Sequence, residues 1–398
     1  MSNDTLPEIR FPGFTEDWEE RKLGDIFVYK QGQQVPVENQ FTKRGKNRHR
    51  FIRIVDLTTN NEAPRYIEYS GDNIISSTDL FMIRYGQPGV IGYGYEGVIA
   101  NNLFKLIPKI ETYNLFFKYI LDSMYPKIQS LSSSTTMPAI SFKSLDVLAV
   151  RYPDKKEQEK IGSFFAQLDN TIAHHQRKLD LLKETKKGFL QKMFPKNGAK
   201  VPEIRFPGFT EDWEQRKLGD LTTWTKGQGL TKEDLNKERD GSEAVHYADL
   251  YKFSPVMHEV IHWTNSDDGR IIPDNSLLFP ASDVTPVGLA RTSTLRLSGV
   301  KAGGDVIIGQ LNESINSSFM SYQINANSKK ILPLITGTTV KHIQAKSLAT
   351  VSVSITNMAE QTAIAGIFEQ LDDTITLHQR KLDLLKETKK GFLQKMFV

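Results

Sequence analysis

The sequence predicts an α+β protein with two globular domains, each followed by a long helix, in a pseudo-twofold tandem repeat. Pro7 to Asp25 returns at Pro202 to Asp220 with a single difference, and His175 to Phe194 returns unaltered at His378 to Phe397. Between these repeated segments the two halves diverge. A period of roughly 200 residues indicates duplication of whole domains, not a solenoid of short repeats.

Composition limits the classes of function. A chain of 398 residues is too long for one ordinary core and predicts two or three domains. It contains no cysteine, which excludes disulfides, thiolate metal sites and a cysteine nucleophile. No apolar run approaches the ~18 residues of a membrane span, and the first residues lack a signal-peptide core. The lack of cysteine fits a reducing cytoplasm, so we expect a cytoplasmic protein. The net charge is only +4, so any nucleic-acid binding must come from local patches.

The repeats divide the chain into four parts. The junction at 195–200 contains Pro195 and Gly198, residue types that end helices. We expect a first domain at 1–153, its helix at 154–195, a second domain at 196–353 with its repeated segment at 202–220, and a second helix at 354–398.

Each expected helix carries a sustained heptad pattern, with steps of four and three residues between seam positions. The seam is roughly 50 Å long at ~1.5 Å per residue, so the helix needs a partner, and the other copy, lying antiparallel, is the simplest one. His175 and His378 are expected to fix the register, and Lys186 and Lys389 to extend to solvent. The remaining seam positions are Ile161, Phe165, Leu168, Ile172, Leu179, Leu182, Phe189 and Met193, and Ile364, Phe368, Leu371, Ile375, Leu382, Leu385, Phe392 and Met396.

Three segments match catalytic motifs in residue pattern. His258-Glu-Val-Ile-His262 would bind zinc if it were helical, with Glu259 as general base, but its β-branched residues and turn-like flanks favour an extended segment. Gly92 to Gly97 spells a dinucleotide fingerprint but precedes a strand-like segment, and Asp154 with Glu184 only loosely matches a nuclease pattern. There is no phosphate-binding loop and no amino-methyltransferase tetrapeptide, so the chain is predicted to bind and not to catalyse.

The clearest candidate binding surface is basic. Residues 43–53 contain six cations and no acid, which suits phosphate contacts, and arginines can also read base edges. A solvated basic loop is the alternative. Polar, glycine-containing segments recur at matched places in the two halves. The candidate DNA-binding residues are Gln33, Lys43, Arg44, Lys46, Arg48, Arg50, Arg53, Thr135, Thr136 and Lys143, and, in the second half, Lys226, Gln228, Ser282, Arg291, Thr338, Thr339, Lys341 and Lys346.

The whole chain resembles the specificity (S) subunits of type I restriction–modification enzymes. The resemblance rests on the doubled PEIRFPGFTEDWE…RKLGD openings, the doubled EQ…I…F.QLD.TI…HQRKL helices and their alternation with dissimilar domains. It implies two target recognition domains, each a mixed α/β globule, separated by two conserved helices in an antiparallel coiled coil. Residues 27–150 and 222–353 would then read the two halves of an asymmetric, bipartite site in double-stranded DNA, at a gap that the helices set.

The resemblance also implies partners. The helices would dock two modification (methyltransferase) subunits, which use S-adenosylmethionine to methylate adenine. Restriction subunits would add translocation and cleavage with ATP and Mg²⁺. This chain would hold no cofactor or metal of its own, and the family offers no motif for base-reading residues. The alternatives are a coiled-coil adaptor that does not bind DNA, a zinc hydrolase using the histidine segment, and a DNA-binding subunit without restriction partners.

Overall fold

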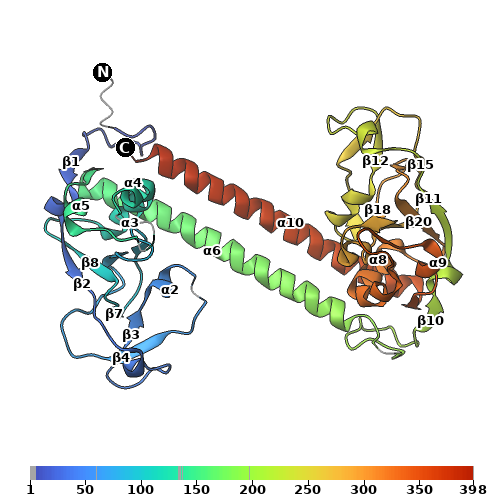
Figure 1. Ribbon diagram of the computed structural model, residues 1–398, viewed down its shortest axis with the longest axis horizontal. Coiled ribbons are helices and arrows are strands. Elements are labelled where there is room, and N and C mark those ends of the chain that lie inside the picture. The colour runs from blue at the N-terminus through green and yellow to red at the C-terminus, as the bar shows by residue number, and fades with distance from the viewer. Residues whose placement is uncertain (1–5, 60, 133–135, 137, 197, 398) are drawn as a thin grey trace. The chain divides into compact units, whose positions relative to one another are not determined.

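The chain forms two compact units, and Figure 1 labels many of their helices and strands. The computed structural model describes residues 6–59, 61–132, 136, 138–196 and 198–397. Unit 1 comprises residues 1–176 and 380–398, and unit 2 comprises residues 177–379. Each unit therefore contains one globular domain together with the adjoining parts of both long helices. Every helix in the described ranges is too short or too polar to span a lipid bilayer.

The globular part of unit 1 is built on three small sheets. The repeated segment supplies β1 (Glu19–Lys22), which pairs antiparallel with β9 (Ala149–Tyr152). The second sheet has the order β2 (Phe27–Gln31), β8 (Leu103–Pro108), β5 (Leu80–Ile83), β6 (Ile91–Gly92), and the third β4 (Arg65–Glu68), β3 (Arg48–Ile52), β7 (Val98–Ile99). The short helices are α1 (Leu23–Ile26), η1 (Val37–Asn39), α2 (Ile54–Leu57), α3 (Asn114–Ser123), α4 (Tyr125–Ser130) and α5 (Phe142–Asp146).

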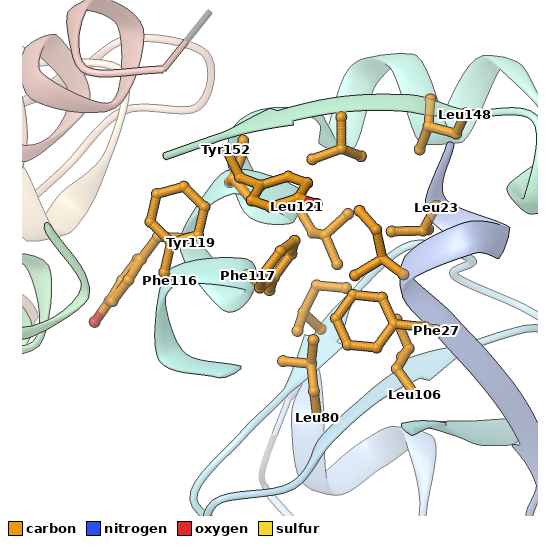
Figure 2. Close-up of a cluster of buried hydrophobic side chains, with 14 of the residues drawn as sticks. Leu23, Phe27, Leu80, Leu106, Phe116, Phe117, Tyr119, Leu121, Leu148 and Tyr152 are labelled. Carbon is orange, nitrogen blue, oxygen red and sulfur yellow. The ribbon is translucent and has the colours of Figure 1, made fainter. Parts of the chain in front are cut away.

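The core of unit 1 lies between the four-stranded sheet and α3. Figure 2 shows Phe117 of α3 among side chains from the sheet and from α1, including Leu80 and Leu106. Phe116 and Phe117 are fully buried, since the apolar face of a ten-residue helix needs the sheet as its partner. Phe165 of the first long helix belongs to the same cluster. The long helix is therefore an integral part of this core.

Unit 2 repeats this plan with longer sheets. β10 (Glu214–Lys217) pairs with β22 (Ser352–Ile355), and β17 (Ser282–Asp283) with β21 (Lys341–His342). The five-stranded sheet has the order β11 (Thr222–Lys226), β20 (Val306–Leu311), β16 (Ser276–Pro280), β18 (Ser293–Leu295), β13 (Val256–Met257), and the four-stranded sheet β14 (His262–Thr264), β12 (Ser242–Val245), β19 (Lys301–Ala302), β15 (Arg270–Ile271). The helices are η2 (Leu218–Leu221), η3 (Lys232–Asp234), η4 (Tyr247–Tyr251), α7 (Pro286–Leu289), α8 (Ser317–Ala326), η5 (Ser328–Lys330), η6 (Leu332–Leu334) and α9 (Ala345–Leu348).

The two globular parts share a topology although their sequences diverge. In unit 1, β3 pairs antiparallel with β4 and parallel with β7. In unit 2, β12 pairs in the same two ways with β14 and β19. The pairs β2–β8 and β11–β20, and the helices α3 and α8, correspond as well. The duplication therefore covers the whole domains and not only the segments whose sequence repeats.

The two long helices are α6 (Lys155–Lys192) and α10 (Met358–Lys395), each of 38 residues. In unit 1, Phe164 near the start of α6 meets Phe392 near the end of α10, with ring centroids 5.1 Å apart. In unit 2, Phe194 just after α6 stacks on Phe368 near the start of α10 at 5.9 Å. The helices are therefore antiparallel in both units. None of the predicted seam residues is exposed, and His175 and His378 are half-buried.

A lysine, an aspartate and a tyrosine join the helices to the domain in each unit. In unit 1, Lys389 lies 2.6 Å from the carboxylate of Asp169, which also accepts a 2.8 Å hydrogen bond from the Tyr119 hydroxyl of α3. In unit 2, Lys186 pairs with Asp372, which accepts a 2.7 Å hydrogen bond from Tyr322 of α8. The prediction that these lysines extend to solvent is wrong, because each side chain is about one fifth exposed and ends on a carboxylate.

The repeated opening segment fixes the ends of the helices. In unit 1, Arg10 forms a 2.7 Å ion pair with Glu157 at the start of α6, and the Ile9 amide donates to the carbonyl of Lys395 at the end of α10. In unit 2, Arg205 pairs with Glu360 at 2.7 Å, and the Ile204 amide donates to Lys192. Both glutamate side chains are fully buried, so these pairs specify where each helix meets its domain.

Candidate nucleic-acid interface

The basic segment of unit 1 forms a loop that leads into the hairpin of β3 and β4. Lys43, Arg44 and Lys46 are exposed on this loop, and the structure gives none of them an ion-pair partner within the described ranges. Asn47 has a φ of 62°, a left-handed conformation that asparagine tolerates well, and it turns the chain into β3. The loop therefore presents three unpaired cations to solvent, as phosphate binding requires.

Arg48 and Arg50 lie on β3 and line a polar cavity of about 700 Å³. The guanidinium of Arg48 lies over the ring of Phe41, with its central carbon 3.4 Å from the ring centroid. That of Arg50 lies 5.2 Å from the ring of Tyr95 and 3.2 Å from the carboxylate of Asp56. The Nε atom of Arg50 is buried without a hydrogen-bond partner. Cation–π contact and the carboxylate hold both planar groups at the wall of the cavity.

Arg53 has a different role from the rest of the basic segment. Its guanidinium contacts Asp56 at 3.3 Å, Glu62 at 2.8 Å and the carbonyl oxygen of Ala63 at 3.3 Å. Its side chain is 18% exposed, whereas that of Asp56 is only 1% exposed. Asp56 also accepts the backbone amide of Arg53 and caps α2. All three nitrogens of the Arg53 side chain are thus engaged within the domain, which leaves this residue poorly suited to hold DNA.

The histidine segment of unit 2 is not a helix. Residues 258–261 have no regular secondary structure and His262 begins β14. The Nδ1 atom of His262 lies 2.9 Å from the carboxylate of Asp249, a buried residue that occupies the place of Asp56 in the other unit. His258 and Glu259 are exposed. No group of three or more potential metal ligands occurs in the described part of the chain, so nothing in the geometry supports a zinc hydrolase.

Burial also changes the protonation of a neighbouring histidine. Desolvation lowers the pKa of His246, which precedes η4, and its Nδ1 atom accepts a hydrogen bond of 3.3 Å from the amide of Ala248. Asp249 opposes this shift and accepts the amide of His246 at 2.9 Å. The neutral imidazole is therefore the form that caps η4.

The other candidate DNA-binding residues predicted from the sequence differ in exposure and in their contacts. Pairing of β17 with β21 brings Ser282 and Lys341 beside the loop that carries Thr338 and Thr339. Arg291 donates to the carbonyl oxygens of Tyr251 and Phe253 and is thereby engaged inside the domain. Thr135 lies outside the described residues. The exposed candidates are Thr136, Lys143, Lys226, Gln228, Thr338, Thr339 and Lys346, and the half-buried ones are Gln33, Ser282, Arg291 and Lys341.

One residue that the sequence patterns did not single out lies just before the equivalent strand of unit 2. Arg239 is exposed on the loop that enters β12, and its guanidinium carbon lies 5.6 Å from the ring of Trp263 on β14. Glu238 and Asp240 flank Arg239, so the segment is not basic, and the sequence showed no basic patch there. The only clue in the sequence was a cation near an aromatic residue, and their proximity depends on the β12–β14 pairing.

Comparison with known proteins shows the family to which this chain belongs. The family model for the type I restriction modification DNA specificity domain matches residues 15–184 and again residues 210–387, and the chain belongs to this family. The chain is 21% identical to the type I restriction enzyme MjaVIII specificity subunit of Methanocaldococcus jannaschii, over 95% of this chain and 91% of that protein. It is 24% identical to the putative MjaX specificity subunit of the same organism, over 95% and 92%.

A solved structure shares the fold. The type I restriction–modification system S subunit from M. genitalium superposes with a TM-score of 0.65 at 14% identity, and the match covers 99% of both chains. At this identity the likeness concerns the fold alone. It extends over both globular domains and both long helices, so the doubled architecture is common to the two proteins.

Proposed function

We propose that this chain is the DNA-binding specificity subunit of a type I restriction–modification complex. Its two domains would read the two halves of an asymmetric, bipartite site in double-stranded DNA, at a gap set by the paired helices. Membership of the specificity family and the cationic loop of unit 1 support this function. The chain would contribute recognition and no catalytic step.

One observation carries the proposal. Two domains of different sequence are joined to the same pair of helices through the same contacts, namely the Arg–Glu pair at each helix start and the Lys–Asp–Tyr contact in each unit. Each domain is therefore held on the helices by the same contacts, while the surfaces that would face DNA differ between the two domains. This arrangement suits a DNA site that consists of two different half-sites.

The long helices would dock the modification subunits. Leu181 on α6 is 60% exposed, and Leu384, its counterpart in the repeated sequence, is 64% exposed on α10. Large apolar side chains exposed at the same position of two identical segments suit two identical partners. We infer that two methyltransferase subunits bind there and bring S-adenosylmethionine, and that restriction subunits bring the ATP- and Mg²⁺-dependent chemistry. The complex would act in the cytoplasm.

Selection of bound duplexes from a random library tests the function. The full chain would be purified in complex with its modification subunits, and the bound DNA sequenced. We expect enrichment of two dissimilar half-sites around an unspecified gap of fixed length. Absence of any enriched sequence, or enrichment of a single palindrome, would contradict two independent readers and favour a coiled-coil adaptor.

A further inference from the structure

Each recognition domain holds an arginine over an aromatic ring beside the equivalent hairpin; in unit 1, Arg50 makes a second such contact, with Tyr95, but is also held by Asp56. In unit 1, Arg48 lies over Phe41, and Gly45 lies beside its side chain, since a Cβ atom there would lie 3.0 Å from the Arg48 Cδ atom. The Nε atom of Arg48 makes one long contact with Glu68, at 3.4 Å. Its two terminal nitrogens have no hydrogen-bond partner among the residues that the structure describes.

In unit 2, the guanidinium of Arg239 lies 5.6 Å from the ring of Trp263. The pairing of β12 with β14 and β19 makes Trp263 the counterpart of Tyr66, which bridges Phe41, so the two arginines lie over different rings of the equivalent hairpin. Arg239 adopts a φ of 62°, a left-handed conformation that arginine seldom adopts. No ion pair is found for its guanidinium within the described ranges. Each hairpin thus carries an arginine beside an aromatic ring, and the terminal nitrogens of both arginines have no hydrogen-bond partner among the described residues.

We propose that Arg48 and Arg239 are base-reading residues, and that each contacts a guanine in its own half-site. This inference rests on the proposed function and deepens it. A guanidinium presents two parallel N–H donors in one plane, which match the O6 and N7 acceptors of guanine in the major groove. The ring beneath restricts the side chain before DNA binds, so binding removes less conformational freedom.

Phosphate contact is the competing role, and the surroundings of Arg48 argue against it. The same loop already carries Lys43, Arg44 and Lys46, which are exposed and have no ion-pair partner in the described ranges that would restrain them. A phosphate accepts such mobile cations from many directions and does not require a fixed plane. Orientation by a ring is useful where the ligand is planar and its acceptors lie at fixed positions.

Two reciprocal variants test the proposal in the full complex, with duplex selection as the readout. Arg48→Lys keeps the charge but removes the paired donors, so the preference for one guanine in the first half-site should fall by about 5- to 150-fold while the second half-site stays unchanged. Arg239→Lys should have the mirror effect. Arg21→Lys, on β1 and outside the hairpin, is the matched control and should change neither half-site. Unchanged motifs in both variants would overturn the proposal, as would a change in both half-sites from either substitution.

A second experiment tests guanine contact with the wild-type chain, so its result does not depend on whether a variant folds. Replacing the selected guanine with 7-deazaguanine deletes the N7 acceptor and should weaken binding several-fold at that position alone. Half-sites that contain no guanine, or indifference to the replacement, would overturn the inference while leaving bipartite recognition intact. Failure to enrich any bipartite motif would instead contradict the proposed function itself.

Discussion

At the scale of single residues, the basic loop of unit 1 separates into cations with different tasks. Lys43 and Arg44 are exposed and unpaired in the described structure, whereas Arg53 is held by Asp56 and Glu62. Replacing Lys43 and Arg44 by alanine should weaken binding to all sequences equally and reduce the slope of log affinity against log salt by about one for each phosphate that is no longer neutralised. Filter binding at several salt concentrations measures this. An unchanged slope would remove the loop from the interface.

His246 gives the second domain a pH-dependent stability. Its folded-state pKa lies below the ordinary value of 6.5, chiefly through desolvation. The unfolded chain therefore binds more protons below that pH, so this residue destabilises the fold as the pH falls through 6.5. His246→Gln should flatten the dependence of the melting temperature on pH between about pH 5 and 7. His258→Gln, an exposed position in the same domain, is the control and should leave the curve unchanged; equal curves for both variants and the wild type would contradict this account.

At the scale of elements, the Lys–Asp–Tyr contacts connect three helices in each unit. Asp372 lies between Lys186 of α6 and Tyr322 of α8, and all three side chains are largely removed from solvent. Asp372→Asn should lower the free energy of unfolding by about 1–3 kcal/mol, because a charged hydrogen-bond acceptor is removed beside a lysine that remains. Denaturant titration measures it.

The controls for this substitution come from the duplicated helix and from its exposed face. Asp169→Asn should have a comparable effect in unit 1, since Asp169 joins Lys389 and Tyr119 in the same way. Asp373→Asn replaces an exposed carboxylate next to Asp372 on the same helix and should cost less than about 0.5 kcal/mol. If Asp372→Asn cost no more than Asp373→Asn, the Lys–Asp–Tyr contact would not contribute to holding the domain on the helices.

The elements differ in how far the sequence predicts them. The heptad pattern was sufficient to predict α6 and α10. A stripe of apolar residues every three to four positions specifies both a helix and its buried face. The lysine contacts were missed because their aspartates come from the other helix and their tyrosines from α3 and α8. The topology common to the two domains was hidden too, since its strands of two to six residues keep their pairing while their side chains change.

At the scale of the whole molecule, the repeats predicted the duplicated plan and the family, but not the reading surfaces. The candidate DNA-binding residues include Arg53 and Arg291, whose guanidinium groups are engaged within their domains. Arg239 was missed because its acidic neighbours removed any charge signal. Charge along the sequence identified the basic loop, whereas the contact between Arg239 and Trp263 depends on the pairing of β12 with β14.

The spacing of the half-sites shows whether the helices set the gap. Inserting four residues into both helices, after Ala173 and after Thr376, adds about 6 Å to each at ~1.5 Å per residue. Duplex selection with this variant should recover both half-site sequences unchanged, separated by a gap about one or two base pairs longer. An unchanged gap, or altered half-site sequences, would contradict the account of two independent readers on a common helical spacer.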